Sequence, residues 1–173
     1  MRYTHAACAM LCAVVLATSA SAQTHTLATD VADIIAKEAV AACSAQGVKA
    51  TVKVVYAANT QKAVARAEGS TPLGLDFAQA KINTVILTGQ PSGGPGAPQT
   101  VKGANPKVMV FTGVVGVDGA NGKLIYGISA GGAVPIKIGD EMIGVVGVSG
   151  APSPGTDIAC AQAGLAKVAD RLK

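Results

Sequence analysis

The spacing of apolar residues switches between two periods along this chain of 173 residues. Residues 27–46, 72–87 and 156–172 repeat with the period of a helix, with Leu27, Val31 and Ile35 on one face of the first. Six β-branched or alternating runs predict strands, at residues 51–57, 62–68, 108–117, 123–129, 134–138 and 141–148. Because hairpins of strands lie between the helices, the pattern predicts an α+β fold, an antiparallel sheet covered by helices.

Residues 89–106 interrupt this regular pattern. The run Gly-Gln-Pro-Ser-Gly-Gly-Pro-Gly-Ala-Pro is too rich in glycine and proline for a helix or strand. A loop of this length inside a domain is often functional, but it is also where a variable insertion is tolerated. Both interpretations stay open.

The N-terminus has the pattern of a secretory signal peptide. Arg2 precedes an apolar run from Ala6 to Ala17, and Ala20 and Ala22 satisfy the small-x-small cleavage rule. The alternative is an N-terminal membrane anchor, for which the apolar run is short. We therefore expect residues 1–22 to be a signal peptide, residues 23–173 to be a single domain, and the protein to be periplasmic or secreted.

Two cysteines remain after the predicted cleavage, Cys43 in the first predicted helix and Cys160 in the last. An oxidising compartment and antiparallel helices would favour a disulfide between them. A helical wheel, however, puts them on opposite-handed flanks of their apolar stripes. A disulfide and two buried free thiols both remain possible.

Catalytic and nucleic-acid-binding patterns are missing from the sequence. His25 is the single histidine beyond the predicted cleavage site, so a Ser/His/Asp triad or Cys/His pair would depend on a residue near the N-terminus. No P-loop or zinc-ligand spacing occurs. The net charge of +4 is dispersed and aromatic residues make up 3% of the chain, which disfavours nucleic-acid binding. These patterns favour a binding protein over an enzyme.

The C-terminal half contains three distinctive blocks: Gly131-Gly-Ala-Val-Pro-Ile136, Gly139-Asp-Glu-Met-Ile-Gly-Val-Val-Gly-Val-Ser-Gly150, and Asp157 at the start of a helix that contains Ala163-Gly164-Leu165. Together they resemble the C-terminal signature of the haem-binding GlcG/HbpS-like family. Val64-Ala-Arg66 and Ala80-Lys81 match the family's second strand and second helix. Residues 55–59 depart from it, because an expected Asp and small-Gly turn is replaced by Val-Tyr-Ala-Ala-Asn.

The resemblance implies a profilin-like fold, with a central antiparallel sheet of about five strands and packed helices. It also implies a homo-oligomer that binds haem or another tetrapyrrole, in haem sensing or handling. Haem requires an apolar slot, an axial ligand and cations for its propionates. Arg66 and Lys81 lie at family-matching positions and could meet carboxylates, or could be ordinary surface charges. His25 is the candidate metal ligand, alongside Met109, Met142, Tyr56, Tyr126 and the two cysteines.

A second interpretation is a module that binds a small organic acid. Backbone amides at Gly131-Gly132 and Ser149-Gly150 could hold the carboxylate, since glycine-rich turns can present such groups. A third is a structural subunit of an oligomer without a ligand.

Overall fold

A computed structural model describes residues 24–93, 101–102, 109–110, 113–117 and 122–173. The predicted signal peptide and most of the predicted loop at 89–106 lie outside these residues. Along the chain the elements are α1 (Thr29–Ser44), β1 (Thr51–Tyr56), β2 (Gln61–Arg66), α2 (Gly74–Thr88), β3 (Val101–Lys102), β4 (Met109–Val110), β5 (Gly113–Val117), β6 (Leu124–Ile128), β7 (Ala133–Ile138), β8 (Glu141–Ser149), α3 (Pro154–Ala166) and the short 3-10 helix η1 (Ala169–Arg171).

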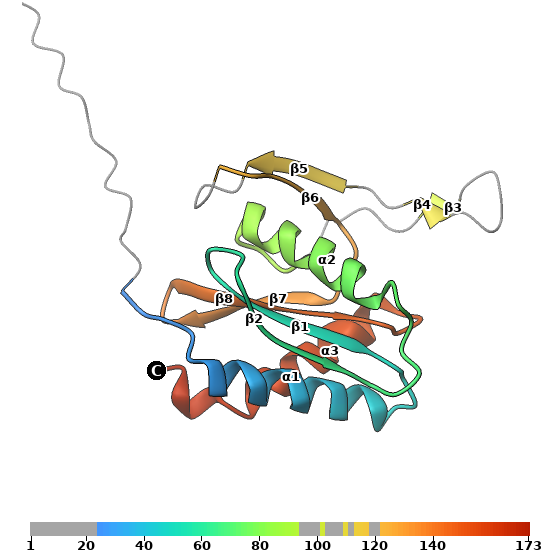
Figure 1. The fold of residues 1–173 in the computed structure, drawn as a ribbon, viewed down its shortest axis with the longest axis horizontal. Helices are drawn as coiled ribbons and strands as arrows, with labels where there is room; N and C mark the ends of the chain where they lie inside the picture. Colours follow the sequence, from blue (N-terminus) through green and yellow to red (C-terminus); the bar gives the residue numbers. More distant parts are fainter. Residues whose placement is uncertain (1–23, 94–100, 103–108, 111–112, 118–121) are drawn as a thin grey trace, which may run out of the picture.

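A four-stranded antiparallel sheet lies at the centre, in the order β2-β1-β8-β7. Figure 1 shows α1 and α3 on one face of the sheet and α2 on the other. Alternate residues of β1 serve the two faces: Val52 and Val54 join the core under α1 and α3, while Val55 joins the core under α2. The predicted α+β class, with helices packed on an antiparallel sheet, is confirmed.

The strands β5 and β6 form a separate hairpin on the outer side of α2, away from the central sheet (Figure 1). Side chains of α2 hold the hairpin by the backbone of β6. The Asn83 Nδ2 donates to the Tyr126 carbonyl at 2.7 Å, and the Thr84 Oγ1 donates to the Ile128 carbonyl at 2.7 Å. The expected sheet of about five strands is therefore corrected to four among the described residues, because this hairpin pairs with itself and packs on a helix.

The helices α1 and α3 run antiparallel and approach closely. Gly164 permits the approach, because a Cβ there would lie 2.5 Å from the Ile35 carbonyl and 3.0 Å from the Ala39 Cβ. One helical turn from Ala39 and from Gly164, Cys43 and Cys160 form a disulfide with their Cα atoms 5.4 Å apart. Because the two helices pack so closely, Cys43 and Cys160 can meet although each lies on the flank of the apolar stripe of its helix. The helical wheel alone did not indicate this contact.

Two ion pairs join α1 to the residues that follow α3, as expected if the two helices are antiparallel. The Arg171 guanidinium lies 2.6 Å from the Asp30 carboxylate, and the Lys167 ammonium lies 3.7 Å from that of Glu38. Within the described ranges, no helix combines the length and apolar character needed to cross a bilayer.

Candidate functional site

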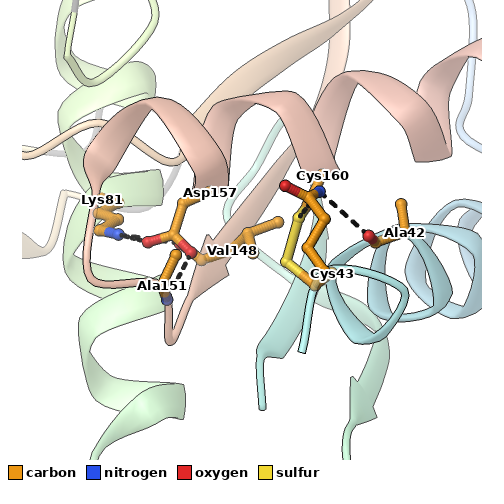
Figure 2. Close-up of a disulfide and its surroundings, with 8 residues drawn as sticks. Ala42, Cys43, Lys81, Val148, Ala151, Asp157 and Cys160 are labelled. Carbon is orange, nitrogen blue, oxygen red and sulfur yellow. Dashed lines mark hydrogen bonds and ion pairs between the residues drawn. A yellow bond between two sulfur atoms is a disulfide. The ribbon is translucent and has the colours of Figure 1, made fainter. Parts of the chain in front are cut away.

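A buried ion pair joins α2 to the first turn of α3. The Lys81 Nζ lies 2.7 Å from the Asp157 Oδ2 and also donates to the Val148 carbonyl at 3.0 Å. Lys81 is 5% exposed and Asp157 is 2% exposed. Figure 2 shows the pair beside the end of β8. Charges this deep are tolerated where they are paired and hydrogen-bonded, as both are here.

The second oxygen of Asp157 holds the loop that follows β8. The Ala151 backbone N–H donates to the Asp157 Oδ1 at 3.0 Å. Burial raises the pKa of Asp157 above its ordinary value, while the Lys81 ammonium and the backbone amides of Ala151 and Gly150 act in the opposite direction. The carboxylate thus binds a cation on one side and a backbone turn on the other.

Gly132 lies against the ion pair, which fills the space that a side chain at this position would need. Its φ is +137°, and a Cβ at this position would lie 2.5 Å from the Val148 carbonyl and 2.7 Å from the Lys81 Nζ. Any other residue would be strained in its backbone and would displace the lysine. The glycine is therefore required by the cluster of Lys81, Gly132 and Asp157, here called the lysine–aspartate cluster.

A cavity of about 290 Å³ opens beside the lysine–aspartate cluster. Its lining is mostly apolar around the buried pair and comprises Thr71, Phe77, Lys81, Ile128, Ala130, Gly131, Ser149, Gly150, Ala151, Pro152, Pro154 and Asp157. Four residues expected from the sequence to bind a ligand, Lys81, Gly131, Ser149 and Gly150, thus line one cavity. Gly132 adjoins it.

The two other expected site residues lie elsewhere. Arg66, at the exposed end of β2, donates to the Ser70 Oγ at 3.2 Å and to the Thr71 carbonyl at 2.7 Å. It therefore braces a residue of the cavity rim without lining the cavity. His25 contacts Glu141 at the opposite end of β8, with its Nδ1 2.6 Å from the Glu141 Oε2.

The segment that carries His25 is held to the first residue of β8. The Thr24 Oγ1 donates to the Glu141 Oε2 at 2.7 Å, and the backbone N–H groups of Thr24 and His25 donate to the Oε1 at 2.8 and 3.2 Å. Hydrogen bonds from His25, and then from Thr24, lower the pKa of Glu141 from 4.5 to about 2. Glu141 thus fixes the N-terminal segment that carries His25.

A second, more polar cavity of about 440 Å³ lies between α2, β6 and the turn that joins β1 to β2. We call it the amide cavity, and its lining consists of Lys53, Asn59, Gln79, Asn83, Lys123, Leu124, Ile125 and Tyr126. The sequence did not predict this cavity, because its residues come from three distant segments. The one local signal is Gln79 and Asn83, which lie one helical turn apart.

The other candidate haem ligands have varied surroundings. Cys43 and Cys160 form the disulfide, so neither offers a thiolate. Met142 packs against the apolar core beneath α2, as expected for a gap-filling methionine. Tyr126 is 63% exposed. The described part of the chain holds no group of three or more His, Cys, Asp or Glu residues that could bind a metal ion.

Comparison with known families identifies the fold's relatives. The family model described as "Haem degrading protein HbpS-like" matches residues 27–166. The chain belongs to the HbpS-like family. The match spans α1 through α3, and thus includes both halves of the lysine–aspartate cluster. Comparison with curated proteins gave no match.

Several solved structures share the fold. A double mutant of HbpS from Streptomyces reticuli is 21% identical, with a TM-score of 0.62 over 96% of this chain and 99% of that chain. The ORFY protein of Klebsiella pneumoniae is 20% identical, with a TM-score of 0.61 over 85% and 93%. A structure described as a PduOC:haem complex is 20% identical, with a TM-score of 0.59 over 82% and 94%.

Proposed function

We propose that this chain is an exported haem-binding or tetrapyrrole-binding protein that handles or senses its ligand. One observation carries the proposal: the chain belongs to the HbpS-like family and shares its fold with a protein crystallised with haem. Binding, rather than turnover, is proposed because the sequence offers no catalytic constellation.

The cavity beside the lysine–aspartate cluster does not fit haem. Its walls are mostly apolar, but the described residues that line it include no histidine, cysteine, methionine or tyrosine to coordinate iron. The charge of Lys81 is already matched by Asp157, so it is not available to a propionate. We therefore assign Lys81 and Asp157 a structural role, in which they hold α2, α3 and the end of β8 together.

Binding of a small organic acid in the same cavity is disfavoured by a similar argument. The amides of Gly150 and Ala151 already bind a carboxylate, which is that of Asp157. The amides of this turn thus bind an anion that the chain itself supplies.

His25 is the residue proposed to coordinate iron. Histidines that bind metals usually have their second ring nitrogen fixed by a carboxylate or carbonyl. Glu141 fixes the Nδ1 of His25 in this way, so the Nε2 is the nitrogen that would coordinate. The side chain of His25 is 48% exposed, which lets a large planar ligand approach it.

A haem titration tests this function. The purified chain, followed by absorbance at micromolar haem, should give a saturable Soret band. His25→Ala should shift that band, whereas Lys37→Ala on the exposed face of α1 should not. Absence of a Soret change in the unaltered protein would refute haem binding. A Soret band unaffected by His25→Ala would refute only the assignment of the ligand.

Export and assembly are further parts of the proposal. Removal of residues 1–22 should leave a chain that begins at Gln23, in a compartment that permits disulfides, which accords with the bond between Cys43 and Cys160. Intact mass of the protein expressed with its own leader measures the cleavage. A full-length mass in the membrane fraction would instead indicate an N-terminal anchor. Light scattering should give an oligomer rather than a monomer.

A further inference from the structure

The amide cavity is built from three elements that meet at one end of the sheet. Asn59 comes from the turn between β1 and β2, Gln79 and Asn83 come from α2, and residues 123–126 come from the start of β6. Tyr56, just before that turn, pairs with Gly144 near the beginning of β8. The cavity therefore extends from Lys53, which pairs with Gly147, to the turn at the end of the sheet nearer to Glu141 and His25.

A network of side-chain amides forms a rigid wall of this cavity. The Asn83 Oδ1 accepts hydrogen bonds from the Gln79 Nε2 at 2.7 Å and from the Asn59 Nδ2 at 3.1 Å. The Gln79 Nε2 also donates to the Asn59 Oδ1 at 3.0 Å. The Asn59 Nδ2 donates one N–H within this network, and the Asn83 Nδ2 donates one to the Tyr126 carbonyl, so each of these amide nitrogens carries a second N–H. Such preformed donors suit an oxygen acceptor on a ligand.

Lysine side chains make the cavity positive. Lys53, on the α2 face of β1, and Lys123, at the start of β6, both line it. The ion pairs found among the described residues do not include Lys53. Burial lowers the pKa of Lys53, against an opposing effect of Asp76. An anion in the cavity would restore the electrostatic stabilisation that this lysine loses on burial.

The edge of the cavity is apolar and exposed. Leu124 is 51% exposed and Tyr126 is 63% exposed, whereas Ile125 between them is 5% exposed. Large apolar side chains that are grouped and exposed commonly mark a binding surface. A flat apolar body could lie against Leu124 and Tyr126 while its acidic arm enters the cavity.

We propose that the amide cavity binds the propionate carboxylates of haem, with Lys53 and Lys123 as their cationic partners and with Leu124 and Tyr126 against the macrocycle. This inference rests on the proposed function, because it names the surface that holds the same ligand. Haem is a planar apolar molecule with two carboxylates on one edge, which matches a positive cavity beside an apolar rim. His25 is not required by it, since the carboxylates and the iron are bound by different groups.

Haem dimethyl ester, in which both carboxylates are blocked, separates the contribution of the carboxylates to binding from that of the apolar macrocycle. Lys53→Met combined with Lys123→Gln should weaken haem binding by about tenfold or more, the effect of losing hydrogen bonds to a charged group. The same double variant should bind the ester as the unaltered protein does. Lys37→Met combined with Lys137→Gln, which removes two exposed lysines elsewhere, should leave both affinities unchanged. Tyr126→Ala should weaken haem and ester equally.

Absorbance titration distinguishes failure of the inference from failure of the function. If the unaltered protein gives no Soret band, haem binding itself is refuted, and this site with it. If haem binds but the lysine double variant retains its affinity, or the ester binds as tightly as haem, the carboxylate site is wrong while haem binding stands. Urea unfolding checks each variant, and Lys123→Gln alone replaces the double variant if Lys53→Met does not fold.

Discussion

At the scale of single residues, the pairing of Lys81 with Asp157 matters more for stability than any surface charge. Lys81→Met would leave the Asp157 carboxylate buried without its cation, so we expect a loss of about 3–5 kcal/mol. Lys81→Met combined with Asp157→Leu should recover much of this, because no charge then remains buried. Urea unfolding measures both. Lys167→Met, which breaks an exposed pair with Glu38, is the control and should cost at most about 1 kcal/mol. Equal losses for the two lysines would contradict the structural role assigned to the buried pair.

Glu141, at the other end of β8, should make the stability of the fold depend on pH. Its pKa in the folded protein is about 2, below the ordinary value of 4.5. A carboxyl group with a lowered pKa stabilises the fold above its ordinary pKa, and this contribution disappears as the pH falls through the lowered pKa. Glu141→Gln should therefore lower the thermal midpoint above pH 4.5, and the two midpoints should converge as the pH approaches about 2. A gap that stays constant over this range would mean that His25 and Thr24 do not hold the carboxylate in solution.

At the scale of elements, the seam between α1 and α3 depends on one glycine. Gly164→Ala places a Cβ against the Ile35 carbonyl and the Ala39 side chain, so the helices must separate. We expect a loss of about 1–3 kcal/mol, the usual cost of overpacking. Gly155→Ala in the first turn of α3 is the matched control, because its Cβ would approach only the Ser153 Oγ at 3.6 Å. The control should be neutral or stabilise the helix slightly. Chemical denaturation of the two variants compares them, and equal midpoints would exclude the tight seam.

The helices and strands were largely predictable from the sequence, but the elements that each of them pairs with or packs against were not. Periodicity predicted three helices, and the run from Lys123 to Ser129 was predicted to return as a strand, which is β6. Alternation reports which face of a strand is buried and carries no information about its partner, so the sequence did not separate the hairpin of β5 and β6 from the sheet. The family resemblance led to Lys81, and the glycine-rich turns led to Gly131 and Ser149. It did not reveal that Asp157, interpreted as a first-turn acid, binds a lysine 76 residues away.

At the scale of the whole molecule, the two ends of the sheet differ in what they offer a ligand. One end is closed by the lysine–aspartate cluster, where the Lys81 ammonium and the Ala151 N–H already bind acceptors of the chain. Towards the other end lie His25 and the turn that lines the amide cavity, and the exposed side chains of Leu124 and Tyr126 line the same cavity. Stability and ligand binding are thus assigned to opposite ends, so variants of Lys81 should affect the unfolding free energy more than the affinity for haem.

The disulfide should contribute to the stability of the whole molecule, because it joins its first and last α-helices. It links Cys43 in α1 to Cys160 in α3 across 117 residues of sequence, and it restricts the unfolded chain strongly because the loop it closes is long. Cys43→Ala combined with Cys160→Ala should therefore cost about 2–5 kcal/mol. Thermal unfolding with and without reductant provides the measurement. Reductant should lower the midpoint of the unaltered protein toward that of the double variant, whereas the double variant itself should not respond. A midpoint of the unaltered protein that is insensitive to reductant, under conditions in which thiol labelling confirms reduction, would show that packing at Gly164 holds the helices without the bond.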